Sequence, residues 1–238
     1  VVARTWTKTR KITATWDSGS DVNGAGVKGC GYIWDTYPDT VPTTQVRTTD
    51  LTAESLDLSD GNSHWFHIRT IDNAGNASET VHMGPFYIDA TPPASASVII
   101  AGGAEATASM QVSLMLAAAD GASGLKEMQF SNDNTAWSEP ISFSATAMWN
   151  LTVGTGIKTV YARFSDQAGN WMTNPVSDTI RLQERPANPQ NQTVDRTTNT
   201  TVTLKWSKNA EAGVTYAVYR CRTEGGVFYR VNTWPVDD

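Results

Sequence analysis

Asp72-Asn73-Ala74-Gly75-Asn76 returns 94 residues later as Asp166-Gln167-Ala168-Gly169-Asn170. Each copy follows a stretch with strand-like alternation, Ile68-Arg69-Thr70-Ile71 in the first case and Ala162-Arg163-Phe164-Ser165 in the second. An Asp at the start of a turn can accept hydrogen bonds from the backbone just ahead, and Gly tolerates positive φ. The spacing is about the length of one small β-sandwich domain. The repeat therefore predicts tandem antiparallel β-sandwiches, each containing this turn.

Alternating apolar residues place the remaining strands. Ile12, Ala14 and Trp16 predict one strand, and Val112, Leu114 and Leu116 predict its counterpart in the second copy. Further strands are expected in segments that lie between turn-forming residues: Val27 to Asp35, Leu51 to Leu58, Val81 to Ile88, and the stretch containing Met128 and Phe130. The predicted fold class is all-β.

Pro-containing segments divide the chain into three parts. Asp89 to Pro93 and Glu184 to Pro189 read as stiff, extended linkers, because Pro removes a backbone donor and restricts the preceding residue. The predicted domains are sandwiches at 1–90 and 91–185 and an incomplete one at 186–238. The last part has only about half the strands of a sandwich. We expect the polypeptide to continue past residue 238; the alternative is that another chain supplies the missing strands.

Charge and cysteine content limit the classes of partner. The net charge is −6, and no long run of Lys or Arg is present, which argues against nucleic acid as a partner. The longest apolar stretch, Val112 to Ala119, is too short to span a bilayer. Cys30 and Cys221 fall in different domains and are expected to be free thiols.

Two segments carry a resemblance to known families. The run from Gly26 to Thr36, followed by Pro38 to Pro42 and the Asp72–Asn76 turn, resembles the tandem immunoglobulin-like repeats of large bacterial surface and secreted proteins. Leu204 to Ser207 with Tyr216 to Arg220 resembles the first half of a fibronectin type III module. The resemblance implies sandwiches of about seven strands and a location outside the cell or on its surface. It also implies no catalytic residues and no cofactor.

An aromatic and cationic stripe is the first candidate binding site. Trp65, His67 and Arg69 alternate with Phe66 and Ile68 and are expected on the outward face of their strand, and Tyr161 and Arg163 repeat two of these positions. Such a face can stack a sugar ring or anchor a protein. The alternative is a cross-strand pair that only shields the sheet backbone.

Acidic loops are the second candidate site. No metal site is predicted, because the acidic residues lack the Asp-x-Asp-x-Asp spacing of calcium loops and Asp in a turn usually bonds its own backbone. The alternative is that carboxylates at the sandwich ends are calcium ligands, and five are candidates: Asp17, Asp21, Asp72, Asp120 and Asp166. A zinc site is not expected, because His64 and His67 lie on opposite strand faces, and His67 with His82 supplies only two ligands. Common catalytic motifs are absent from the sequence.

The sequence therefore predicts a non-catalytic structural or spacer array of an extracellular or cell-surface protein, able to assemble into a filament or layer. The expected partners are neighbouring domains of the same chain or copies of itself. The alternative function is an adhesion module that binds a glycan or a surface protein through the aromatic face.

Overall fold

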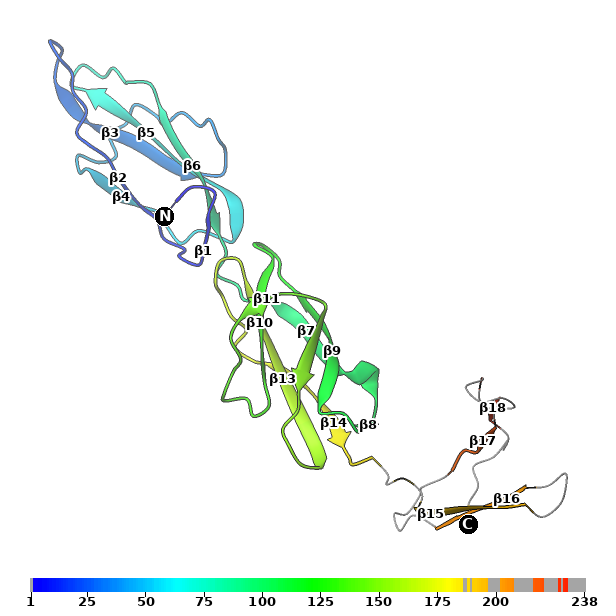
Figure 1. Cartoon of the computed structure of the whole chain (residues 1–238). Helices are drawn as coiled ribbons and strands as arrows, with labels where there is room; N and C mark the ends of the chain where they lie inside the picture. The colour runs from blue at the N-terminus through cyan, green and yellow to red at the C-terminus, as the bar shows by residue number, and fades with distance from the viewer. Residues whose placement is uncertain are drawn as a thin grey trace. The chain divides into compact units, whose positions relative to one another are not determined.

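The structure is a computed structural model that describes residues 2–185, 188, 190–196, 202–207, 216–220, 227 and 229–230. The regular elements of these residues are β-strands and one short 3-10 turn, which confirms the predicted all-β class (Figure 1). Contacts divide the chain into two compact units, 1–182 and 183–238. The first unit contains the two Asp-x-Ala-Gly-Asn turns.

The first sandwich is built from two sheets. Its larger sheet has the order β1-β6-β5-β3 and its smaller sheet pairs β2 with β4. The strands are β1 (Trp6–Thr7), β2 (Thr13–Thr15), β3 (Val27–Asp35), β4 (Thr52–Glu54), β5 (Gly61–Asp72) and β6 (Val81–Ile88). The bounds of β3 and β6 agree with the predicted ones, whereas the expected strand from Leu51 to Leu58 is confined to β4.

The second sandwich repeats this plan with added strands. Its larger sheet has the order β11-β10-β13-β14-β8, and its smaller sheet has the order β12-β9-β7. The strands are β7 (Ala94–Ile100), β8 (Ala106–Thr107), β9 (Gln111–Ala119), β10 (Leu125–Ser131), β11 (Ile141–Ser142), β12 (Thr146–Asn150), β13 (Gly156–Asp166) and β14 (Val176–Leu182). The turn η1 (Ala101–Gly103) follows β7.

The unit at 183–238 contains two described strand pairs. β15 (Gln190–Arg196) pairs with β16 (Val202–Ser207), and β17 (Tyr219–Arg220) pairs with β18 (Tyr229–Arg230). Trp206 contacts the ring of Tyr216, with ring centroids 5.4 Å apart. Cys221 lies outside the described residues, and Cys30 is a buried free thiol.

Each sandwich has its own hydrophobic core. In the first, Ile12, Ala14 and Phe66 lie in the core, and Trp16 stacks on Phe66 with ring centroids 5.9 Å apart. In the second, Leu114 and Val160, which correspond to Ala14 and Phe66, lie in the core. The period-2 pattern that predicted β2 and β9 therefore also identified which face of each strand is buried.

Two glycines allow a loop to lie across β3. A Cβ at Gly29 would approach the carbonyl oxygen of Thr48 to 2.7 Å, and one at Gly31 would approach that of Thr43 to the same distance. Cys30, between them, forms an isolated antiparallel bridge with Thr48. Close backbone approach explains the Gly-Cys-Gly sequence in this strand.

Candidate metal and junction site

Asp89 is the residue that ties the first sandwich to the second. It follows β6 and is 0% exposed. Its backbone N–H donates to the carbonyl of Thr7 (2.9 Å), within the first sandwich. Its carboxylate accepts from the N–H of Thr91 (3.1 Å) and of Ser123 (3.0 Å), and its carbonyl accepts from the Asn170 amide (2.8 Å). The linker is therefore hydrogen-bonded to both sandwiches.

Two further carboxylates come from the second sandwich. Asp120 begins the loop between β9 and β10, and its Oδ1 accepts from the N–H groups of Ala122 (3.2 Å) and Gly124 (2.6 Å). Asp166 opens the second Asp-x-Ala-Gly-Asn turn and accepts from the Asn170 backbone N–H (2.8 Å) and amide Nδ2 (2.6 Å). These are the local Asx bonds that the sequence predicts, and they orient both side chains.

The three carboxylates converge. One oxygen each from Asp89, Asp120 and Asp166 lie within 4.8 Å of one another, and Asp166, like Asp89, is 0% exposed. This is the one group of three potential metal ligands within the described residues. None of the four ion pairs found among those residues involves any of the three. Two buried carboxylates and a half-buried one, gathered without an ion-pair partner, favour a bound cation.

Geometry and ligand type fit a hard divalent cation. Two oxygens that each bind Ca²⁺ at about 2.4 Å lie at most about 4.8 Å apart, and carboxylate and carbonyl oxygens are its usual ligands. The hydroxyl of Ser123 is buried without a hydrogen-bond partner among the described residues. The backbone N–H of Ser123 donates to Asp89, so the unsatisfied hydroxyl belongs to a residue that contacts one of the three carboxylates.

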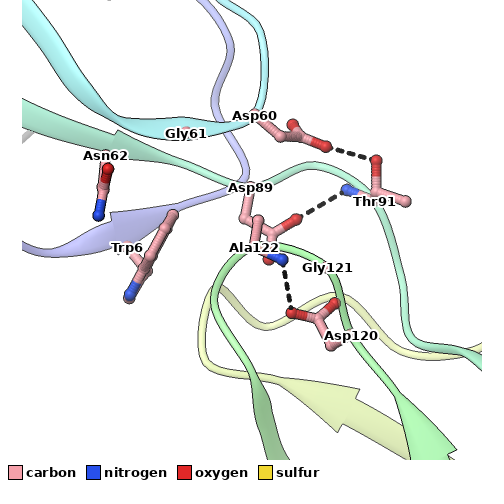
Figure 2. Close-up of a pocket in the computed structure, with 9 residues that line it drawn as sticks. All are labelled: Trp6, Asp60, Gly61, Asn62, Asp89, Thr91, Asp120, Gly121 and Ala122. Carbon is pink, nitrogen blue, oxygen red and sulfur yellow. Dashed lines mark hydrogen bonds between the residues drawn. The ribbon is translucent and has the colours of Figure 1, made fainter.

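A cavity of about 450 Å³ opens beside these carboxylates (Figure 2). It is lined by Trp6, Asp60, Gly61, Asn62, Asp89, Thr91, Asp120, Gly121 and Ala122. Asp60 accepts from the N–H of Ala90 (3.0 Å) and the hydroxyl of Thr91, and it pairs with Arg10 (3.0 Å). Desolvation raises the pKa of Asp60, but these bonds and the Arg10 charge outweigh it, so the pKa lies below its usual value.

The first sandwich contains a partial version of the site. Asp21 and Asp72 line a second pocket of about 230 Å³, and Asp72 bonds Ala74 and Asn76 as Asp166 bonds Asn170. The bond from the Asn76 side chain is the main cause that lowers the pKa of Asp72. Asp17 does not line this pocket. Of the five candidate calcium ligands, the structure brings Asp120 and Asp166 together with Asp89, which was not among the candidates.

The aromatic stripe on β5 is not the exposed face that alternation predicted. His67 is 0% exposed, so the expectation that it faces outward is wrong. Its Nε2 contacts the Tyr37 carbonyl (2.9 Å) and Asp35 (3.2 Å), and its Nδ1 lies 2.6 Å from Nδ1 of His82. Tyr37 follows β3 and contributes to this burial. Trp65 and Arg69 are half-buried.

On the second sandwich, Arg163 lies against two indole rings. Its guanidinium is 4.3 Å from the ring centroid of Trp137 and 5.2 Å from that of Trp171, and its Nε donates to Gln129 (3.0 Å). We call Trp137, Arg163 and Trp171 the Trp–Arg face; all three residues are half-buried, as is Tyr161. Trp171 directly follows the second Asp-x-Ala-Gly-Asn turn, a position that could have drawn attention to it.

The described residues contain no helix that is long and apolar enough to cross a membrane.

Comparison with known proteins gives structural matches alone. No family model matches the chain, and no curated protein matches it. The fibronectin(III)-like modules of Clostridium thermocellum CbhA match at 12% identity over 77% of this chain and 91% of that chain, with a TM-score of 0.40. The central fibronectin-III array of RIM-binding protein matches at 11% identity over 83% and 74%, with a TM-score of 0.28. The FN1–FN3 domains of chicken CNTN1 match at 13% identity over 77% and 66%, with a TM-score of 0.36. All three matches are fibronectin type III or fibronectin(III)-like modules.

Proposed function

We propose that the chain is a non-catalytic spacer array of an extracellular or cell-surface protein, in which the joint between the first two sandwiches is held rigid. The observation that carries this proposal is the fully buried Asp89, which bonds residues of both sandwiches. A linker bonded in this way has few conformations left, and Pro92-Pro93 restricts it further. Association between copies is part of the proposal.

Calcium is the proposed second element of the joint. Asp89, Asp120 and Asp166 would hold the ion, which would neutralise the buried carboxylates and cross-link the linker to the β9–β10 loop and the turn after β13. Because a cation that binds only the folded joint stabilises it by mass action, the ion would also raise the unfolding temperature. Gln183 follows β14 as Asp89 follows β6, so the joint after the second sandwich has an amide at the equivalent position.

Calorimetric titration and thermal unfolding test the calcium site. We expect Ca²⁺ to bind and to raise the melting temperature by roughly 5–10 °C at a hundredfold excess over its dissociation constant. Asp166→Asn should abolish this response. Asp72→Asn is the matched control. It alters the same turn in the first sandwich, whose pocket has two carboxylates, Asp21 and Asp72, in place of three. Absence of binding heat, with identical melting in calcium and in chelator, would contradict the proposed site.

Dipolar spectroscopy tests the spacer role separately. Nitroxide labels on Asp39→Cys and Ala136→Cys, in a Cys221→Ser background, report the distance between exposed sites on the two sandwiches. We expect a narrow distance distribution that broadens in Asp89→Ala, because that variant loses the bonds to Thr91 and Ser123. A distribution equally broad in the parent and in Asp89→Ala would refute a rigid joint.

The Trp–Arg face supports a second candidate, an adhesion function. Two indoles that flank a guanidinium offer flat apolar surfaces and a hydrogen-bond donor, which suits a sugar ring or a protein anchor. A glycan array with Trp171→Ala tests this candidate. Binding should be lost in that variant and retained in Trp65→Ala, which changes an aromatic residue of the first sandwich; equal loss in both would argue against the face.

A further inference from the structure

β12 is an outermost strand of the smaller sheet in the second sandwich. That sheet has the order β12-β9-β7, so one side of β12 pairs with β9 and the other side is an edge. β12 lies between β11 and β13 along the chain, and both of these strands belong to the larger sheet of the same sandwich. The edge is therefore a feature of the sandwich itself.

Two hydrogen bonds show which backbone groups of β12 point toward β9. The N–H of Leu116 donates to the carbonyl of Ala145 (2.9 Å), just before β12 begins. The N–H of Leu151 donates to the carbonyl of Met110 (2.8 Å), just after β12 ends. The direction of these groups alternates along an antiparallel strand. Odd-numbered residues therefore bond β9, and the even-numbered residues of β12 direct their backbone groups away from it.

Met148, at the centre of β12, presents a free donor and a free acceptor at this edge. The N–H of Thr146 bonds the neighbouring Ser144 hydroxyl at 3.3 Å, and the carbonyl of Asn150 accepts from the Asn132 amide at 3.2 Å. Neither the N–H nor the C=O of Met148 has a hydrogen-bond partner among the described residues. Unpaired groups of this kind are a template for pairing with another strand.

The edge also lacks the charge that usually blocks such pairing. Between Glu139 and Lys158 the sequence contains no charged residue, and this stretch includes all of β12. At β7, the opposite edge of the same sheet, the Asp178 carboxylate accepts from the N–H of Ile100 (2.8 Å) and so occupies an outward-pointing donor. The two edges of the sheet are therefore protected to different degrees.

The corresponding edge of the first sandwich carries a charge at the matching position. β4 pairs with β2 as β12 pairs with β9, and the register that joins Thr13 to Glu54 joins Ser113 to Met148. Glu54 is exposed, and Met148 is 59% exposed. The first sandwich thus has a carboxylate where the second has an apolar side chain.

Charge and register favour one occupant of the β12 edge, which is β12 of a second copy. A two-fold axis beside Met148 places this residue opposite its own equivalent and Thr146 opposite Asn150. The free N–H of each Met148 then meets the free C=O of the other copy. A net charge of −6 makes two copies repel each other, whereas this edge places no charged residues face to face.

We propose that the chain self-associates by two-fold antiparallel pairing of β12 with β12 of a second copy. The pairing joins the two smaller sheets into one sheet of order β7-β9-β12-β12-β9-β7. It specifies the association between copies that is part of the proposed function, on which it rests. It uses none of Asp89, Asp120 and Asp166, so a chain that stayed monomeric would leave the calcium site and the rigid joint unaffected.

Sedimentation equilibrium of the full chain tests the pairing through charge at the axis. Met148→Lys places two ammonium groups opposite each other, and Met148→Glu places two carboxylates there. Each variant alone should associate roughly five- to tenfold more weakly than the parent. An equimolar mixture of the two should recover the parent association, because Lys then faces Glu. This recovery depends on the proposed register and would not follow from a general loss of stability.

Met115→Lys is the matched control for the two charged variants. Met115 is 51% exposed on the same outer face of the sheet, but it lies on β9, one strand away from the edge. The control should therefore associate like the parent. Weakening equal to that of Met148→Lys would mean that copies pack through the face of the sheet, and would overturn edge pairing.

Amide hydrogen exchange supplies the second readout. Exchange at Met148 should slow as protein concentration rises, while exchange at Ala147 and Trp149, which bond β9, stays constant. Three further results would overturn the proposal: a monomer up to about millimolar concentration, charged variants that associate like the parent, or protection of Met148 that is independent of concentration. The last result would mean that another segment of the chain covers the edge.

Discussion

Glycine at the fourth position of each Asp-x-Ala-Gly-Asn turn is required by backbone conformation alone. Gly75 has φ +92° and Gly169 has φ +89°, and a Cβ at either residue would have no heavy atom within 4 Å. The turn therefore selects glycine for its freedom at positive φ and not for a close contact. The same turn orients Asp166 toward the joint, which links this residue-scale requirement to the candidate site.

Alanine at these glycines should destabilise the protein through strain. We expect Gly75→Ala and Gly169→Ala each to lower the free energy of unfolding by roughly 1–2 kcal/mol, the usual cost of left-handed backbone for an L-residue. Gly121→Ala is the control, since a Cβ there also meets open space and its φ is not in the positive region. Urea unfolding followed by tryptophan fluorescence measures all three; an equal loss in the control would refute the strain argument.

Acid should destabilise the fold through carboxylates whose pKa is lowered. Hydrogen bonds hold the pKa of Asp60 and Asp72 below their usual value in the folded state. Their stabilising contribution is therefore fully present above the unfolded pKa of about 3.9 and is lost as the pH falls through the folded values. We expect the urea concentration at the unfolding midpoint to decrease as the pH is lowered below about 4. This decrease with pH should be less steep in Asp60→Asn. An unchanged slope in that variant would assign the acid sensitivity to other groups.

At the scale of elements, β9 illustrates how alternation is converted into stability. Leu114 is 0% exposed and Met115 is 51% exposed, although they are neighbours with side chains of similar size. Leu114 lies in the core of the second sandwich, while Met115 pairs with Thr146 and Ile99 on the outer face of its sheet. The face that a residue occupies thus decides what its removal costs.

Truncation of the two neighbours should have very different effects. Leu114→Ala should lower the free energy of unfolding by about 2–5 kcal/mol, because it removes buried apolar surface and leaves a cavity. Met115→Ala should change it by less than about 1 kcal/mol, because its side chain is largely in solvent. Urea unfolding measures both variants. Similar values for the two would contradict the assignment of faces in β9.

At the scale of the whole molecule, two separate cores share one hydrogen-bonded joint. Contacts group residues 1–182 into a single compact unit although Phe66 and Phe164 belong to different cores. Asp89 provides a physical basis for this grouping, because it accepts from Ser123 and Asn170 on the far side of the linker. The two sandwiches are therefore expected to unfold in a coupled manner.

Scanning calorimetry tests that coupling. In the parent protein we expect Leu114→Ala to lower the unfolding temperature of both sandwiches. In Asp89→Ala the joint loses its carboxylate while both cores stay intact. In that background Leu114→Ala should lower the unfolding temperature of the second sandwich alone. If Leu114→Ala lowers the unfolding temperature of the second sandwich alone even when Asp89 is present, the joint does not couple the stabilities of the two sandwiches.

The amino-acid sequence by itself determined the all-β class, the spans of β3 and β6, the core faces of β2 and β9, and the Asx bonds of Asp72 and Asp166. These features depend on side-chain alternation and on backbone bonds within a few residues, both of which are local. Tertiary structure alone decided the burial of His67 and the joining of Asp89 to Asp120 and Asp166. Each of these depends on segments distant along the chain that meet only after folding, where a neighbouring loop or strand changes the exposure, charge environment and hydrogen bonding that a local pattern predicts.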